Sequence, residues 1–365
     1  MRAQVGQFTD AAYTPGWFAA RRGAFRRRRR AGVAALALAG SVMLIGCRGH
    51  DMPAPLPDDF ATQLARATFP LSSVRPCNRD DDLEPIVSAM RTRRVIAMGE
   101  ATHGTREFFD MKQRVFRALV ERGVVTVLAL ETWPELAARA AAYVDGRDRG
   151  TARDAVRAFG LWPFETPEMV EILEWTRAYN QSAHDRPRVR LVGIDARHPE
   201  RDRRMAANVV RVAEQAGSGA VFVWAHNGHV RTEPGAMGSY LRTALGRGYY
   251  CVGFESLGGT FVSNSMWGLL AGRLTVYEFH EESRDYYATY LAESPHPNFF
   301  IDFETADRFP AIHAFLRRRL RSHDFDELYW LKRLRLSSRS IDEPWSGLYD
   351  AVVFIRDTTA ATIVF

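Results

Sequence analysis

The chain has 365 residues, of which 46% are hydrophobic and 25% are charged, an ordinary globular composition that allows one large domain or two small ones. Its net charge of +6 comes from the first 46 residues, which hold eight arginines, no lysine and one aspartate and so carry +7, leaving about −1 for the rest. The positive charge therefore belongs to the N-terminal tail, and the composition gives no reason to expect nucleic acid as a partner.

The N-terminal tail has the pattern of a targeting signal. Five arginines, Arg26–Arg30, precede sixteen small or apolar residues, and Cys47 follows them. A basic region with a short apolar run is typical of a signal peptide, and the run is too short for a comfortable membrane span. The letters LIGC, ending at Cys47, resemble the bacterial lipobox, which implies cleavage of a signal over residues 1–46, lipidation of Cys47 and a membrane-anchored lipoprotein exported to the cell envelope. A soluble secreted protein, an uncleaved anchor and a translation start further downstream stay open as alternatives.

The segment from 47 to 81 is predicted to be a tether followed by an irregular stretch. It begins polar and rich in proline, and a first helix is expected over Asp58–Ala67. A second helical pattern, Asp82–Arg91, precedes the first strongly apolar run. We therefore expect the main domain to cover residues 82–365.

Two cysteines, Cys77 and Cys251, remain after Cys47. Export permits a disulfide between them. Cys251 lies in a predicted buried strand, so a free core thiol is an equal alternative, and the sequence leaves both open.

Short apolar runs alternate with amphipathic ones along the main domain. Most of these runs are continuous, as in strands that are covered on both faces of a parallel sheet. Helical patterns between them, such as Arg106–Arg122 and Arg201–Gln215, indicate βα units. These patterns predict an α/β fold with a mostly parallel central sheet flanked by helices. The predicted strands are Val95–Met98, Val124–Leu130, Val189–Gly193, Ala220–Ala225, Tyr249–Phe254, Thr275–Phe279, Asn298–Phe303 and Ala351–Ile355.

One stretch between the predicted strands, about residues 133–186, contains about three helical patterns and no strand. We expect it to form an inserted helical subdomain. Its later part is aromatic, and Trp162 lies in LWPF, a loop-like break between two helices. Aromatic residues of this kind most often pack between helices, but the break also suits a side chain that lines a substrate pocket.

Ionisable side chains follow six of the predicted strands at the point where each strand ends. In an open parallel sheet the ligand site lies at the carboxyl ends of the strands, so these side chains are predicted to meet at one edge. Acids after strands often cap the next helix instead, which is the leading alternative for Asp195 and Glu255. His103 differs from them, because it lies beside a glycine at a strand-to-helix corner. The residues that follow the strands are Glu100, His103, Glu131, Asp195, His226, His229, Glu255, Arg356 and Asp357.

The sequence lacks the motifs of several common mechanisms. There is no G-x-S-x-G elbow for a nucleophilic serine, and neither remaining cysteine has a local nucleophile motif. There is also no H-E-x-x-H, no G-x-G-x-x-G and no P-loop, so a nucleotide cofactor is not expected. General acid–base work on a water molecule remains, for which histidine is the best-matched side chain near neutral pH, oriented by a neighbouring carboxylate.

Four segments resemble the erythromycin esterase family. They are GEATHGTREFFDMKQRVFRALVERGVVTVLALE from residue 99, WAHNGHV from residue 224, GIDAR from residue 193 and YDAVVFIRDTTAAT from residue 349, and the resemblance covers about Arg94 to Phe365. It implies an α/β sheet with a helical insertion and hydrolysis of a carboxylic ester or lactone. The reaction that gives the family its name is macrolide ring opening, a route to antibiotic resistance.

The resemblance also implies roles for the matching residues. His103 becomes the general base that activates water, while Glu100 and Glu131 orient it or relay its proton. His226 and His229 polarise the carbonyl group or stabilise the oxyanion. Residues expected to surround the substrate are Glu107, Lys112, Asp195, Glu255 and Trp162.

No cofactor is expected, and the implied partner is a small-molecule ester or lactone. The cluster of His and Glu side chains is also suited to a divalent metal ion, so a metal-dependent hydrolase stays open. The rival from another class is a non-catalytic exported lipoprotein that binds haem or iron through the same histidines.

Overall fold

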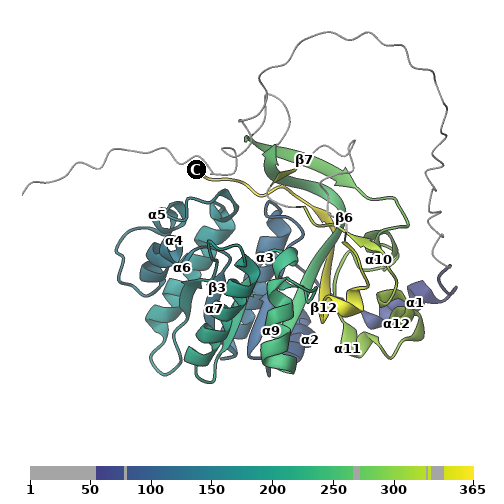
Figure 1. The fold of residues 1–365 in the computed structure, drawn as a ribbon, viewed down its shortest axis with the longest axis horizontal. Helices are drawn as coiled ribbons and strands as arrows, with labels where there is room; N and C mark the ends of the chain where they lie inside the picture. Colours follow the sequence, from purple (N-terminus) through teal and green to yellow (C-terminus); the bar gives the residue numbers. More distant parts are fainter. Residues whose placement is uncertain (1–54, 78–79, 266–271, 326–327, 330–340) are drawn as a thin grey trace, which may run out of the picture. The chain divides into compact units, whose positions relative to one another are not determined.

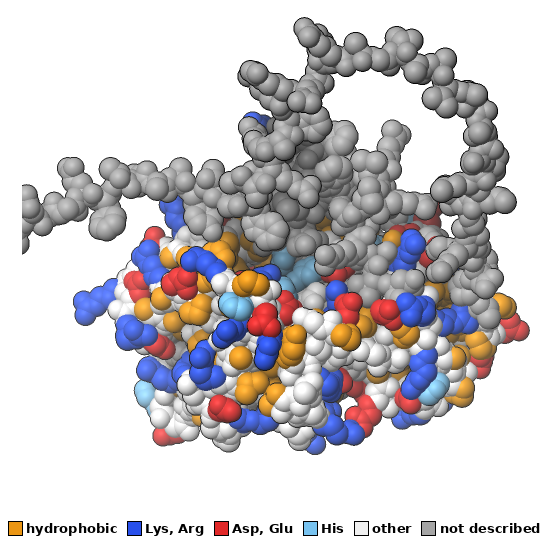
Figure 2. Space-filling view, in the orientation of Figure 1, with side chains coloured by type: hydrophobic (Ala, Val, Ile, Leu, Met, Phe, Trp, Pro, Cys, Tyr) orange, Lys and Arg blue, Asp and Glu red, His pale blue; other side chains and the backbone are white. Residues whose placement is uncertain are grey.

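The structure is a computed structural model, and it describes residues 55–77, 80–265, 272–325, 328–329 and 341–365 (Figure 1). The predicted signal segment and Cys47 lie outside the described residues. None of the described helices is both long and apolar enough to cross a lipid bilayer. On the face shown in Figure 2, basic and acidic side chains are interspersed.

A mixed, mostly parallel sheet forms the centre of the fold, as the sequence predicts. Its strands lie in the order β1, β8, β12, β6, β2, β5, β3, β4, and the six from β12 to β4 are mutually parallel. β8 and β1 extend one edge in the antiparallel sense. The bounds of these strands are β1 Phe69–Pro70, β2 Val95–Met98, β3 Val125–Leu130, β4 Arg190–Gly193, β5 Ala220–Trp224, β6 Tyr249–Ser265, β8 Asn298–Asp302 and β12 Ala351–Thr358.

β6 is much longer than the predicted Tyr249–Phe254 and runs on past the carboxyl edge of the sheet. Its extension pairs in the antiparallel sense with β7, Leu274–His280, and a short parallel strand β10, Leu328–Tyr329, adds to it. A separate two-stranded sheet joins β9, Arg321–Ser322, to β11, Ile341–Asp342.

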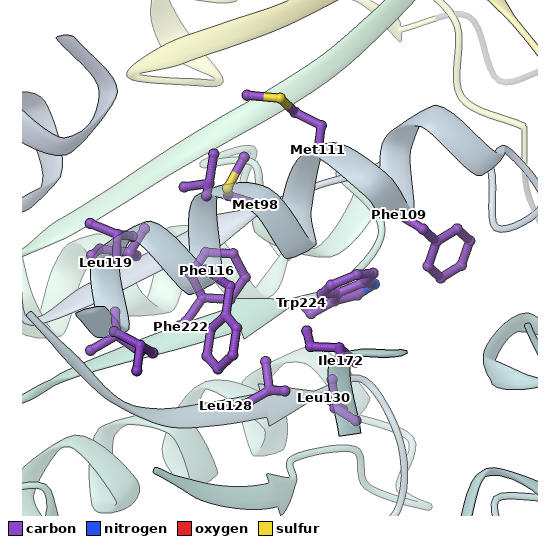
Figure 3. Close-up of a cluster of buried hydrophobic side chains, with 14 of the residues drawn as sticks. Met98, Phe109, Met111, Phe116, Leu119, Leu128, Leu130, Ile172, Phe222 and Trp224 are labelled. Atoms are coloured by element: carbon purple, nitrogen blue, oxygen red, sulfur yellow. The ribbon is translucent and has the colours of Figure 1, made fainter. Parts of the chain in front are cut away.

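Helices cover both faces of the sheet, which explains why its strands are apolar throughout. Ile96 and Met98 of β2 point to one face, where α3 and the helical insertion pack (Figure 3). Val95 and Ala97 point to the other face, against α7, α9 and α12. The bounds of the helices are α1 Phe60–Ala67, α2 Glu84–Met90, α3 Arg106–Glu121, α7 Arg201–Gln215, α8 Asn227–Val230, α9 Met237–Leu245, α10 Tyr287–Leu291, α11 Phe303–Ala306 and α12 Pro310–Leu316.

The predicted helical insertion lies between β3 and β4 and contains no strand (Figure 1). Local sequence fixes where its helices begin. Thr151 and Asp154 form a reciprocal capping box, and Thr166 accepts a hydrogen bond from the Met169 backbone N–H just before a proline. The insertion consists of α4 Pro134–Val144, α5 Ala152–Arg157, a 3₁₀ turn η2 at Trp162–Phe164, and α6 Pro167–Ser182.

The compact unit includes residues that precede the expected domain start at residue 82. Phe60 and Leu64 of α1 belong to the core, and β1 pairs with β8. Cys251 is a buried thiol in β6, so the described residues contain no Cys77–Cys251 disulfide.

Candidate active site

The register of four parallel strands brings the predicted site residues to one edge of the sheet. Trp224 at the end of β5 is level with both Met98 of β2 and Leu130 of β3. Met98 is in turn level with Val252 of β6. The segments that follow β2, β3 and β5 therefore start side by side, which is the arrangement predicted from the topology of such sheets.

The corner after β2 holds an imidazole against a carboxylate. Nδ1 of His103 lies 2.6 Å from Oε1 of Glu100, and the ammonium of Lys112 in α3 donates to Oε2 of the same carboxylate. Because a carboxylate only accepts, a neutral His103 ring carries its hydrogen on Nδ1 and its lone pair on Nε2. Gly104 permits this corner, since a Cβ there would lie 1.8 Å from the carbonyl oxygen of Val262 in β6.

Lys112 is completely buried beneath the corner. Its ammonium lies 4.3 Å from the centre of the Trp224 ring, a cation–π contact. Burial lowers the pKa of Lys112 to about 8, although the negative charge of Glu100 acts to raise it. Burial alone would raise the pKa of Glu100, but Lys112 and His103 together hold it below its ordinary value. Glu100 therefore stays an anionic acceptor at neutral pH.

The second corner follows β5 and is fastened to the first. The amide of Asn227 donates to the Phe254 carbonyl over 2.8 Å and accepts from the Phe254 N–H over 3.1 Å. Gly99 leaves room for this amide, because a Cβ there would lie 2.1 Å from Oδ1 of Asn227. The ring centres of His226 and His103 end up 4.7 Å apart.

His226 is a buried, neutral ring. Its Nδ1 accepts from the Gly228 N–H over 3.1 Å, and its Nε2 lies 3.3 Å from the carbonyl oxygen of Phe325, so the hydrogen is on Nε2. Burial lowers the pKa of His226, although the Asp324 carboxylate opposes this. Both ring nitrogens are thus engaged with the protein itself.

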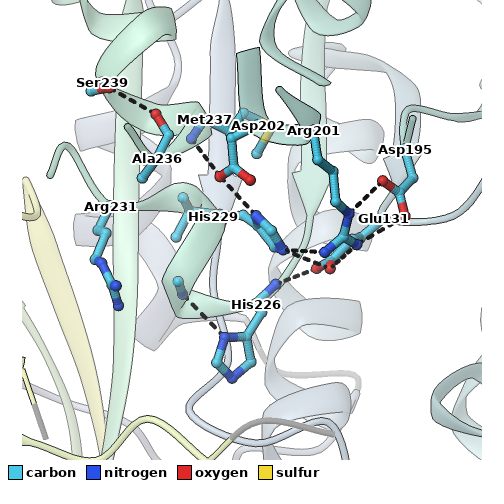
Figure 4. Close-up of polar contacts among 12 residues, drawn as sticks. Glu131, Asp195, Arg201, Asp202, His226, His229, Arg231, Ala236, Met237 and Ser239 are labelled. Atoms are coloured by element: carbon cyan, nitrogen blue, oxygen red, sulfur yellow. Dashed lines mark hydrogen bonds and ion pairs between the residues drawn. The ribbon is translucent and has the colours of Figure 1, made fainter. Parts of the chain in front are cut away.

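His229, three residues later, differs from His226 in its protonation state. Its Nδ1 lies 2.9 Å from Asp202 and its Nε2 lies 3.0 Å from Glu131 (Figure 4). Both partners only accept, so both nitrogens must carry hydrogens. Burial alone would lower the pKa of His229, but the two carboxylates raise it to about 10. His229 is therefore an imidazolium at neutral pH.

Glu131, which directly follows β3, contacts the second corner and the start of α7. Its Oε2 accepts from the backbone N–H of His226 over 2.7 Å, and its Oε1 accepts from His229 and from Nη2 of Arg201, each over 3.0 Å. Burial would raise the pKa of Glu131, but His229, His103 and Arg201 hold it well below its ordinary value.

Arg201 and Asp202 are site residues that the sequence reasoning missed. They begin α7, directly after the loop that follows β4, so the same strand-end rule contained a signal for them. Asp195 holds Arg201 with two hydrogen bonds, 2.7 Å to Nε and 2.8 Å to Nη2. Asp195 therefore orients a guanidinium instead of capping a helix.

Glu255 lies within the extended β6, which corrects the expectation that it follows the end of a strand. It binds His323, another residue that was missed, with 2.6 Å between Oε1 and Nδ1. Burial opposes protonation, but Glu255 and Glu281 raise the pKa of His323 to about 9. Two residues on, the Phe325 N–H donates to the carbonyl of Ala101 over 2.7 Å, so this segment also borders the first corner.

Two further predicted substrate contacts, Glu107 and Trp162, stay predictions. Glu107 accepts from the Thr359 N–H over 2.7 Å and from its hydroxyl over 2.6 Å, which ties α3 to the C-terminal segment. Trp162 is in η2 of the insertion, and among the described residues its buried indole nitrogen has no hydrogen-bond partner. Glu107 therefore fastens the C-terminal segment, and Trp162 belongs to the insertion.

The carboxylates of the cluster are engaged by cations of the chain itself. Lys112 donates to Glu100, and Arg201 and His229 donate to Glu131. Among the residues that the structure describes, no three His, Cys, Asp or Glu side chains converge so that they could hold a metal ion.

The sheet and the cluster at its carboxyl edge define the class of the protein, an α/β protein with a histidine–carboxylate site at its strand ends. The profile of the erythromycin esterase family matches residues 120–200 and 196–358, which is more than half of the chain. The chain belongs to this family, as its motifs predict, and membership indicates a hydrolase that acts on a small molecule. The corner at Glu100 and His103 lies before the matched residues.

Several solved structures share the fold of this chain. A protein from Bacillus cereus matches with a TM-score of 0.72 at 18% identity, covering 85% of this chain and 100% of that one. A succinoglycan biosynthesis protein matches with a TM-score of 0.71 at 16% identity, covering 84% and 98%. A histidine-to-asparagine mutant of the erythromycin esterase EreC, in its open conformation, matches with a TM-score of 0.58 at 15% identity, covering 80% and 98%. At these identities the likeness concerns the fold.

Proposed function

We propose that the protein hydrolyses carboxylic esters or lactones, macrolide-type rings among them, through a water molecule activated by His103. The observation that carries the proposal is the 2.6 Å contact between His103 and Glu100, at a strand end where Glu100 is itself held by buried Lys112. This contact sets the tautomer in which Nε2 can take a proton, and the anionic Glu100 stabilises the imidazolium that forms.

The chemistry needs only groups of this chain and water. Nε2 of His103 takes a proton as the water oxygen bonds to the carbonyl carbon, and the carbonyl π electrons move to its oxygen. When that intermediate collapses, the bond to the alkoxide oxygen breaks and the alkoxide receives the proton from His103. The products are a carboxylic acid and an alcohol, or a single opened chain when the substrate is a lactone.

His226 suits a supporting part in this scheme. Its neutral ring, 4.7 Å from that of His103, adds no positive charge next to the base, so His226 does not oppose formation of the His103 imidazolium. We assign the positive charge of the site to His229 and Arg201, which both contact Oε1 of Glu131.

The test uses a panel of macrolides, simple lactones and p-nitrophenyl acetate, with mass spectrometry to detect the gain of one water. We expect wild-type turnover without added metal, and a loss of about 10²–10⁴-fold in His103→Asn, the usual contribution of a general base. His313→Asn is the matched control, because Nδ1 of His313 also lies 2.6 Å from a carboxylate oxygen, that of Asp307, but on the exposed surface.

Three outcomes would overturn the proposal in different ways. Unchanged turnover in His103→Asn removes His103 as the base. Turnover that a chelator abolishes and a divalent metal restores indicates a metal-dependent hydrolase. The third outcome has two parts. No compound of the panel is hydrolysed, and added haem shows a Soret shift with the wild type but not with variants of His226 and His229. This outcome indicates a haem-binding protein.

A further inference from the structure

Arg201 holds its guanidinium in a fixed orientation at the site while its side chain stays 42% exposed. Asp195 accepts from Nε and Nη2, the edge-on, two-bond geometry that fixes the plane of a guanidinium. The same Asp195 is fixed by the Ala196 N–H, which donates to Oδ1 over 2.6 Å. Nη2 also donates to Glu131. Two of the three guanidinium nitrogens are therefore fully committed.

The third nitrogen, Nη1, directs one N–H towards Nε2 of His229 over 3.1 Å. That ring nitrogen also lies 3.0 Å from Oε1 of Glu131. The second N–H of Nη1 has no acceptor among the residues that the structure describes. Within this part of the chain, Nη1 thus keeps one N–H group for a ligand.

A short chain of contacts links Arg201 to the proposed base. Glu131 accepts from Arg201 and, through its other oxygen, from the backbone of His226 (Figure 4). The centre of the His226 ring lies 4.7 Å from that of His103. The carboxylate of Glu131 therefore lies between Arg201 and His226, and His226 packs against His103. The neighbouring His229 imidazolium adds positive charge, which favours an anionic or partly anionic oxygen at Nη1.

We propose that Arg201 is a catalytic residue of the proposed hydrolysis, whose Nη1 binds the substrate carbonyl oxygen and stabilises the negative charge that forms on it. The inference rests on the proposed function and adds the group that receives the charge. When water attacks, the carbonyl π electrons move to the oxygen held by Nη1, and they return to the carbon when the alkoxide leaves. Arg201 exchanges no proton, because a guanidinium keeps its protons at any working pH.

This assignment gives proton transfer and charge stabilisation to different residues at the edge of the sheet. His103 moves the proton, and Arg201 with Asp195 supplies a pre-oriented cation where charge develops. Removing one such donor usually lowers kcat by about 10²–10³-fold, because the donor acts mainly on the transition state. Asp195 is a positioning residue in this scheme.

The experiment compares Arg201→Ala, Arg201→Lys and Arg203→Gln on p-nitrophenyl acetate or on whichever ester the wild type turns over fastest. Arg203 is the matched control, since it is two residues along the same helix and pairs with Glu200 at the surface, 64% exposed. We expect Arg201→Ala to lose about 10²–10³-fold in kcat with a much smaller change in KM. Added guanidinium chloride at millimolar levels should restore part of that loss in Arg201→Ala and nothing in His103→Asn.

Arg201→Lys keeps a charge but loses the two-bond fit to Asp195, so we expect intermediate activity. Wild-type kcat in Arg201→Ala overturns the inference and leaves the role of His103 intact. Loss of kcat without guanidinium rescue, with Arg201→Lys as inactive as Arg201→Ala, overturns it as well and reduces Arg201 to a structural residue. Failure of His103→Asn to lose activity overturns the proposed function instead.

Discussion

The corner at Glu100–His103 and the corner at His226–His229 both place imidazoles beside carboxylates, but the charge around each ring differs. His103 is paired with the carboxylate of Glu100, which Lys112 shares and partly neutralises. His229 lies between two carboxylates, Glu131 and Asp202. A carboxylate shared with a lysine orients the His103 ring, whereas two carboxylates keep the His229 ring cationic at neutral pH.

The two corners therefore have different roles in the proposed site. His103 transfers the proton, and His229 contributes to the electrostatic field around it. Position relative to the strand end does not distinguish them, and neither does the spacing of three residues that occurs in both corners. Variants that change the partners of each imidazole test this difference most directly.

The largest expected effect on stability comes from breaking the buried pair beneath the first corner. Lys112→Met leaves the buried carboxylate of Glu100 without its lysine partner, which costs about 3–5 kcal/mol for buried pairs of this kind. Urea unfolding at pH 7 measures the loss. The double variant with Glu100→Gln should recover part of it, because the unpaired charge is then removed.

The control for that variant is Arg139→Met, which breaks an ion pair of 2.9 Å with Asp148 on the surface. Exposed pairs contribute about 1 kcal/mol or less. Equal losses of unfolding free energy in Lys112→Met and Arg139→Met would show that burial does not increase the cost of breaking the Lys112–Glu100 pair.

The second expected effect is a pH dependence that belongs to the second corner. The pKa of His229 is raised to about 10 in the folded protein, compared with about 6.5 for a free histidine. A raised pKa stabilises the fold fully below about pH 6.5, and this stabilisation is lost as the pH rises towards 10. We expect the free energy of unfolding to fall by a few kcal/mol at most over this window, at roughly 1.4 kcal/mol per unit.

Unfolding curves between pH 6 and 10 measure this slope, and His229→Gln should flatten it. The pKa of His323 is raised to about 9, so His323→Gln should remove a smaller part over a narrower window. A wild-type slope that persists unchanged in His229→Gln would contradict a cationic ring there.

The smallest expected effect is at Glu107, which belongs to neither corner although its sequence position suggested substrate contact. Its carboxylate is occupied by Thr359. We expect Glu107→Gln to leave kcat/KM within about twofold, as for most surface substitutions. A selective rise in KM would instead return Glu107 to the substrate site.

Much of the fold was predictable from the sequence because burial on both faces of the sheet leaves a local mark. The runs VIAM and AVFVW are apolar at every position, since alternate residues enter the two cores. The start of α7 at Arg201 and its end at Gln215 also match the helical pattern. The extension of β6 to Ser265 was not predictable, because its partner β7 is a later segment whose pairing leaves no local signal.

The site was predictable where topology alone decides position. Residues directly after parallel strands had to share an edge, and Glu100, His103 and Glu131 do. Arg201 could not be told from its neighbours Arg203 and Arg204 by a single sequence, because only the packed structure decides which guanidinium meets Asp195. His323 arrives from a distant segment with no periodic pattern, so no local rule could place it against Glu255.

The position of β12 in the sheet has a consequence for how the chain is made. β12 follows β6 and β8 along the chain, yet it lies between them in the sheet and pairs with both. Just after it, the Arg106 N–H donates to the carbonyl of Thr359 and the Ala361 N–H donates to the carbonyl of Gly104, at the base of the first corner. Because synthesis releases the chain from its N-terminus at about 5–20 residues per second, β6 and β8 lack their shared neighbour until β12 has left the ribosome. The corner that carries His103 therefore gains these two contacts only after β12 has been synthesised.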